Sequence, residues 1–120
     1  MYTGYTEIFT KYRHPKYQDA NIVLDVFCRH YDLNMYELLQ MLQRHNQRFK
    51  QCFFYVLHST TALNYHDLAT TFNVVRTIVI RYISEAKQLL KKANPTVEET
   101  VYINDINNIK KEVARCLHFL

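Results

Sequence analysis

Apolar residues recur every three or four positions along most of this chain, the spacing of one face of an α-helix. The pattern predicts six helices, over about 19–31, 34–42, 47–59, 64–72 and 74–91, and from 101 or 102 onward. A single Gly and two Pro leave few positions for hairpin turns, which disfavours strands. We therefore expect an all-α fold, a helical bundle of five to six helices with an added C-terminal helix.

Residues 64–91 predict two helices joined by a sharp turn, a helix-turn-helix motif. Asn64 is a suitable N-cap for the first helix, and Asp67 lies in its first turn, where a carboxylate offsets the helix dipole. Asn73 follows this short helix. After Gly, Asn is the residue that best tolerates the left-handed conformation in which helices end. The chain is therefore expected to turn at Asn73 and to start the next helix at 74 or 75.

The second helix of the motif is amphipathic. Wound at about 100° per residue, one arc holds Val75, Ile78, Val79, Tyr82, Ile83, Ala86, Leu89 and Leu90. The opposite arc is polar and basic, with Ile80 as its exception. An exposed isoleucine is unfavourable in water, but in a DNA major groove its methyl groups can contact thymine methyl groups. An ordinary amphipathic helix hairpin would show the same two arcs.

The net charge of +4 is unevenly distributed. Residues 41–92 include two acidic residues and eight basic ones, for a net charge of +6, whereas the rest of the chain has −2. The basic residues are Arg44, Arg48, Lys50, Arg76, Arg81, Lys87, Lys91 and Lys92. Such asymmetry favours a protein with one side facing a polyanion, although many basic faces are only solvated.

The sequence predicts four regions: an N-terminal arm over 1–19, a helix-turn-helix domain over 20–92, a linker over 93–100 and a C-terminal helix over 101–120. The arm is aromatic and basic, and Pro15 disfavours a helix around it. We interpret the arm as a strap over the core, with a flexible basic arm as the alternative. The last helix is expected to pack on the bundle, with a homodimer contact as the alternative. Its apolar residues recur at helical spacing and are Tyr102, Ile106, Ile109, Val113, Cys116 and Leu117.

Motifs of catalysis and metal binding do not occur in the sequence. A phosphate-binding loop needs more than the single glycine, Gly4, and neither a nucleophile elbow nor a His-Glu-x-x-His helix is found. The cysteines, Cys28, Cys52 and Cys116, form no Cys-x-x-Cys pair and are expected to be free thiols, two of them buried. We predict that the chain is not an enzyme and uses no cofactor, metal or small-molecule substrate. Since no long apolar run occurs, we expect neither a signal peptide nor a membrane span, and a cytoplasmic location.

Four motifs share their order and spacing with one known family. They are Asn21-Ile22-x-x-x-Val26-x-x-x-x-Tyr31-x-Leu33-x-x-x-x-Leu38-Leu39, Arg48-x-Lys50-Gln51, Asp67-Leu68-Ala69-x-x-Phe72 and Arg76-Thr77-Ile78-Val79. On these residues, the stretch from about 20 to 91 resembles the C-terminal DNA-binding domain of the bacterial replication initiator DnaA. The chain departs from that family at Val74-Val75, where the family has Arg-Asp and one more residue in the turn.

The resemblance implies a helix-turn-helix of the Trp-repressor-like type, whose second helix enters the major groove of double-stranded DNA. It also implies a basic loop, of which Arg44 and His45 remain, and contacts from Lys50, Gln51, Arg76 and Thr77. Together with the basic and apolar residues noted above, the expected DNA-binding residues are Arg44, His45, Arg48, Lys50, Gln51, Arg76, Thr77, Ile80 and Arg81. The family's ATPase module has no counterpart in the sequence.

Two functions are compatible with these observations. The first is sequence-selective DNA binding, as a regulator of transcription or an accessory replication factor without ATPase activity. It requires that positions 44–51 and 76–81 share one cationic surface. If five phosphates are neutralised, log K should fall with log salt at a slope of about −4.5. The alternative is a helical protein–protein interaction module that keeps the fold without DNA binding. An apolar spot such as Ile80 on the polar face would suit it.

Overall fold

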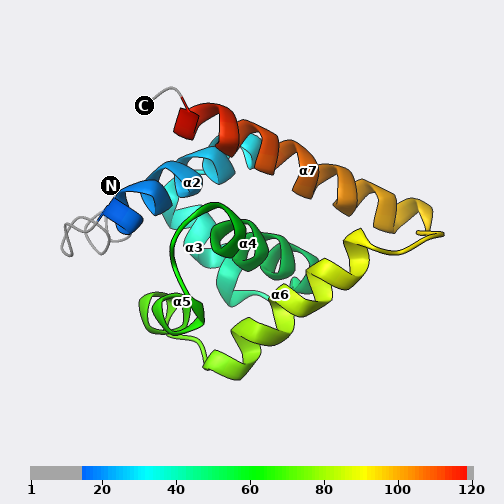
Figure 1. Cartoon of the computed structure of the whole chain (residues 1–120), viewed down its shortest axis with the longest axis horizontal. Coiled ribbons are helices and arrows are strands. Elements are labelled where there is room, and N and C mark those ends of the chain that lie inside the picture. Colours follow the sequence, from blue (N-terminus) through cyan, green and yellow to red (C-terminus); the bar gives the residue numbers. More distant parts are fainter. Residues whose placement is uncertain (1–14, 119–120) are drawn as a thin grey trace.

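Six α-helices make up most of residues 15–118, the part of the chain that the computed structural model describes (Figure 1). They are α2 (Pro15–Tyr31), α3 (Met35–Gln43), α4 (Gln47–Thr60), α5 (Tyr65–Phe72), α6 (Arg76–Leu90) and α7 (Val97–His118). No strand occurs in the described residues. The prediction of an all-α bundle with an added C-terminal helix is confirmed.

Helix α4 is the centre of the bundle, since it contacts each of the other five helices. In Figure 1, α7 extends above it beside α2, and α6 passes below it toward the loop that leads to α7. The core beneath these helices is rich in aromatic rings. Phe53 of α4 packs against Phe27 at 5.2 Å and against Phe72 at 5.1 Å between ring centroids. This ring cluster joins α2, α4 and the end of α5.

Asparagine side chains cap the starts of three of the helices, among them the predicted cap Asn64. Asn34 and Asn64 form capping boxes, in which the asparagine accepts from the backbone of Glu37 or Asp67 and its own N–H donates to that carboxylate. Asn46 accepts from the backbone N–H of Phe49 at 3.1 Å. These bonds satisfy amide groups that a helix start otherwise leaves without partners.

The first helix begins earlier than predicted, at Pro15 instead of residue 19. The last five residues of the predicted arm, 15–19, are therefore helical. Proline suits the first position of a helix because its missing N–H would have no partner there. Tyr17 is buried in the core, whereas residues 1–14 of the arm lie outside the described part of the chain.

The last helix also begins earlier, at Val97 instead of 101, so part of the predicted linker is helical. Ile106, Ile109 and Val113 of this helix are buried, and the helix contacts α2 and α4. A homodimer through this helix stays a prediction. No described helix is long and apolar enough to span a bilayer.

Helix α6 buries most of its predicted apolar arc. The buried residues are Val79, Tyr82, Ile83, Ala86 and Leu89, while Ile78 and Leu90 pack against the core in part. Val75 is the exception, because 62% of it is exposed. The helix begins at Arg76, so Val75 is the extended N-cap residue, and its side chain does not follow the helical arc.

The turn between α5 and α6 has the left-handed residue that the sequence predicts. Asn73 has φ 54° and ψ 50°, and the N–H of Val74 donates to the carbonyl of Ala69 at 3.0 Å. Asp32 at the end of α2 also has φ 54°, and Leu33 there donates to Cys28 at 2.8 Å. Both helices therefore end on a left-handed residue, a conformation in which glycine is most common.

We expect Asn73→Ala to lower the free energy of unfolding by about 1 kcal/mol, because a Cβ without a polar partner disfavours the left-handed conformation. Asn73→Gly should leave stability unchanged or raise it. Urea denaturation measures both variants. Thr70→Ala, an exposed change in α5, is the control. An Asn73→Ala variant as stable as the native protein would show that the turn is not strained.

Candidate nucleic-acid interface

The outward face of α6 is polar at its N-terminal end. Arg76, Thr77 and Arg81 are exposed, and Ile80 between them is partly exposed. The guanidinium of Arg81 lies 4.0 Å from a carboxylate oxygen of Glu85 and 5.2 Å from the centroid of the Tyr82 ring. Because the opposite face of α6 is in the core, these side chains are presented on a fixed helix.

Gln43 at the end of α3 and Lys50 of α4 are brought to this end of α6. Lys50 and Gln43 share the lining of a hollow of about 450 Å³ with residues of the α5–α6 turn and of α6. Arg44 and His45 follow Gln43 and are exposed between α3 and α4. The lining consists of Leu39, Leu42, Gln43, Lys50, Phe54, Phe72, Asn73, Val74, Ile78 and Tyr82. Two segments about 30 residues apart in sequence therefore meet around one hollow.

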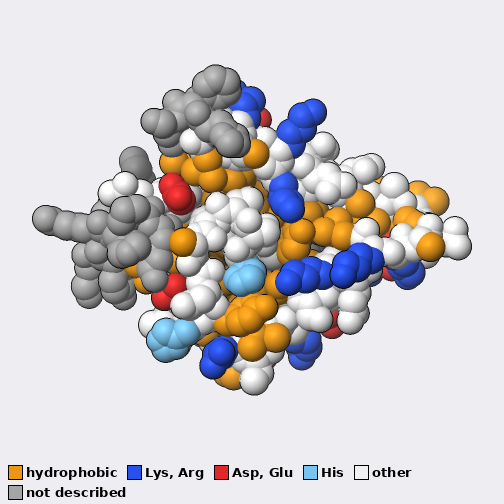
Figure 2. Space-filling model, viewed as in Figure 1, with side chains coloured by type: hydrophobic (Ala, Val, Ile, Leu, Met, Phe, Trp, Pro, Cys, Tyr) orange, Lys and Arg blue, Asp and Glu red, His pale blue; other side chains and the backbone are white. Residues whose placement is uncertain are grey.

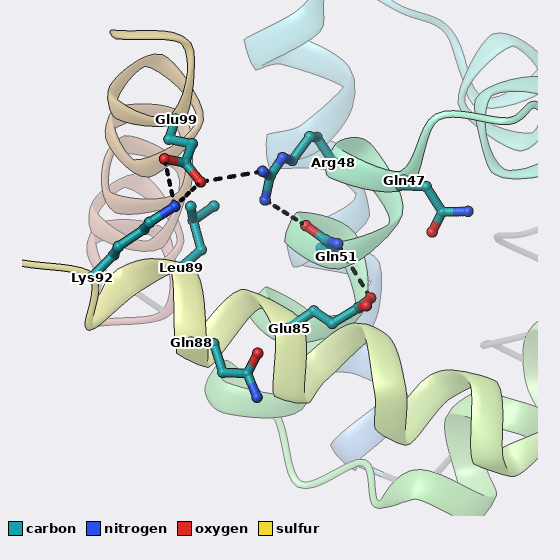
Figure 3. A pocket seen from close by; sticks show the side chains of 8 residues that line it. All are labelled: Gln47, Arg48, Gln51, Glu85, Gln88, Leu89, Lys92 and Glu99. Atoms are coloured by element: carbon teal, nitrogen blue, oxygen red, sulfur yellow. Dashed lines mark hydrogen bonds and ion pairs between the residues drawn. The ribbon is translucent and has the colours of Figure 1, made fainter. Parts of the chain in front are cut away.

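Gln51 is buried, whereas its predicted role in DNA binding requires an exposed side chain. It is only 7% exposed, and its amide donates to Glu85 at 3.2 Å while its oxygen accepts from Arg48 at 3.3 Å (Figure 3). A buried amide with both groups bonded inside the protein is not available to a base or phosphate. The structure therefore pairs Gln51 with Arg48 and Glu85 inside the protein, apart from the exposed residues at the start of α6.

Arg48 is likewise directed inward, toward α7. Its guanidinium lies 3.5 Å from a carboxylate oxygen of Glu99 and 5.8 Å from the centroid of the Tyr102 ring. Arg48 and Gln51 face a second hollow, of about 520 Å³, between α4, α6 and the start of α7 (Figure 3). It is lined by Gln47, Arg48, Gln51, Glu85, Gln88, Leu89, Lys92 and Glu99.

Glu99 is the residue of this hollow that the sequence analysis missed. Lys92 donates to both of its carboxylate oxygens, at 2.7 and 2.9 Å, and the backbone N–H of Thr96 donates at 2.9 Å. These bonds, of which that from Lys92 has the largest effect, lower the pKa of Glu99 to about 2, so its carboxylate is charged at neutral pH. The motif Thr96-x-x-Glu99 is a capping box and was a usable signal for both the residue and the helix start.

Basic side chains follow α6 on the face shown in Figure 2, and acidic ones are sparse over the same helix. From the residue exposures, Arg76, Lys87 and Lys91 lie on the solvent side of α6 or at its end. The basic residues of α6 are thus exposed along one helix, a distribution that suits a polyanion.

The cysteines are free, and Cys28 and Cys52 are buried as predicted. Burial raises the pKa of Cys52 to about 12, so this thiol stays protonated and unreactive at neutral pH. Within the described residues, no three or more His, Cys, Asp or Glu side chains come together in a way that could hold a metal ion.

Comparison of the chain with protein-family models, with curated proteins and with solved structures finds no match. The resemblance to the DnaA C-terminal domain therefore remains a prediction from the four quoted motifs.

Proposed function

We propose that this chain binds double-stranded DNA sequence-selectively through a helix-turn-helix formed by α5 and α6. In this proposal it acts as a regulator of transcription or an accessory replication factor without ATPase activity. The main supporting observation is the exposed, basic N-terminal half of α6, which follows a left-handed turn and has its other face in the core. That arrangement suits a helix whose first turns enter a major groove.

In the proposed complex, three side chains of α6 contact base edges. Arg76 donates to the two acceptors of a guanine, Thr77 reaches an adjacent base, and Ile80 contacts a thymine methyl group. The N-cap of α6 is Val75, whose side chain cannot accept a hydrogen bond. The first amide groups of α6 therefore suit a phosphate oxygen, which also gains from the helix dipole.

Other basic residues contact the phosphates on either side of the groove. Arg44, with His45 next to it, and Lys50 lie on the α4 side, where Lys50 shares a hollow with Ile78 of α6. Arg81 and Lys87 are exposed on α6 itself. Arg48 and Gln51 are left out of this set because their polar groups bond inside the protein.

Selection from a random duplex pool at two salt concentrations tests the proposal. If Arg44, Lys50, Arg81 and Lys87 each neutralise one phosphate, log K should fall with log salt at a slope of about −3.6. We expect an enriched sequence pattern at both concentrations. Retention of no duplex at physiological salt, or a slope near zero, would contradict the proposal.

A protein–protein interaction module is the second candidate function. It is favoured by the exposure of Val75 and by the mainly apolar side chains, among them Leu42 and Ile78, that line the neighbouring hollow. This candidate predicts salt-insensitive capture of a partner protein and no shift of a duplex, so the same salt series distinguishes the two functions.

A further inference from the structure

A single carboxylate lies between two cations where α4, α6 and α7 meet (Figure 3). The carboxylate of Glu99 accepts from Lys92 at 2.7 and 2.9 Å and lies 3.5 Å from the guanidinium of Arg48. Arg48 comes from α4, and Lys92 follows the end of α6. The two cations thus form an anion site, and the protein's own Glu99 is the anion in it.

Glu99 has two separable roles in this position. As a residue of the capping box, it accepts from the backbone N–H of Thr96 at 2.9 Å, and its own N–H donates to the Thr96 hydroxyl at 3.1 Å. A glutamine can make the same box, because its side-chain oxygen also accepts. Only the negative charge is specific to the contact with Arg48 and Lys92.

The anion site continues the line of basic residues along α6. Arg81 contacts Glu85, which accepts from Gln51, which in turn accepts from Arg48 beside Glu99. From Arg81 to Lys92 the helix rises about 16 Å. Each strand of a duplex carries one phosphate per about 3.4 Å of helix axis, so this rise spans about five phosphates of one strand.

We propose that Arg48 and Lys92 form a binding site for a DNA backbone phosphate, which Glu99 occupies in the free protein. This inference rests on the proposed function. A guanidinium and an ammonium group suit a phosphodiester, and Gln47 and Gln88 line the same hollow. When a duplex binds, its phosphate displaces the carboxylate, so Glu99 limits how tightly the chain holds DNA.

The variant Glu99→Gln tests the site, because it removes the charge and keeps the capping box. One phosphate bound at the freed site should steepen the slope of log K against log salt by about 0.9, which makes the gain in affinity about 3.5-fold smaller at 200 mM than at 50 mM salt. We expect duplex affinity at 50 mM salt to rise about tenfold. Glu98→Gln is the matched control, since Glu98 is exposed one residue away and the net charge changes equally.

Lys92→Gln in both backgrounds completes the test. In the native protein we expect a change of less than about twofold, because losing Lys92 weakens the competing Glu99 contact as well as the phosphate contact. In the Glu99→Gln background, Lys92→Gln should make the slope of log K against log salt less steep by about 0.9. Thermal denaturation checks that each variant is folded. The second variant is Glu99→Asp. The aspartate side chain is too short to reach both cations, but it can still cap the helix, as Asp67 does in α5. This variant should raise affinity by a smaller factor.

The outcomes separate the two proposals. If the native protein binds duplex and Glu99→Gln matches the Glu98→Gln control in affinity and slope, the phosphate site is overturned and the proposed function stands. An equal loss from Lys92→Gln in both backgrounds would also overturn the site, because Lys92 would then be free in the native protein. If neither the native protein nor any folded variant shifts a duplex, the proposed function itself fails.

Discussion

Replacing Phe53 by alanine should lower the free energy of unfolding by about 3–5 kcal/mol. Phe53 is fully buried on α4, and its ring centroid lies 5.1–6.0 Å from those of Phe27, Phe49, Phe54 and Phe72. Removal of the ring leaves a cavity among residues of three helices, which cannot all move inward to fill it. Urea denaturation followed by circular dichroism measures the loss.

Two matched changes define the scale of this prediction. Phe53→Leu keeps most of the volume and should cost less than the alanine variant. Val97→Ala removes an aliphatic side chain that is 86% exposed and should change stability by less than about 0.5 kcal/mol. A loss below about 1 kcal/mol for Phe53→Ala would show that the ring cluster around α4 is not the main core.

Replacing Arg76 by alanine should reduce discrimination between the preferred duplex and one with its guanine changed by about 5- to 150-fold, or 1–3 kcal/mol. Arg76 is exposed at the first position of α6, where a side chain in a major groove reaches base edges. Binding to both duplexes, measured by fluorescence anisotropy at one fixed salt concentration, gives the discrimination directly.

Arg44→Ala is the comparison variant, because Arg44 is exposed between α3 and α4 and is assigned to the DNA backbone. It should weaken binding to all duplexes alike and reduce the salt slope by about 0.9. If Arg76→Ala leaves both the affinity and the preference unchanged, α6 does not enter the groove in the proposed orientation.

Much of the local structure follows from short-range physics and could be predicted from the sequence. Asn34, Asn46 and Asn64 cap helices because their side chains reach an amide three residues ahead, which spacing alone reveals. Asn73 ends α5 because few other residues adopt a positive φ at low cost. The exposed Arg76, Thr77 and Arg81 follow equally from the period of one amphipathic helix.

The two helix starts that differ from prediction, at Pro15 and Val97, have local causes. Proline disfavours a helix around it but is tolerated at the first helical position, which is where Pro15 lies. Thr96 and Glu99 form a capping box in the predicted linker, and the helix starts at Val97, directly after Thr96. In both cases the sequence contained the information, in the choice of residue and its spacing.

The sequence by itself determined the helices, their caps, the turn at Asn73 and the face that α6 turns to solvent. Only the tertiary structure decided that Arg48 and Gln51 point inward, because their partners Glu85 and Glu99 lie 34 to 51 residues away on other helices. A helical period specifies which side of a helix is polar. Which neighbouring helix meets that side, and with what charge, depends on how the helices pack around α4.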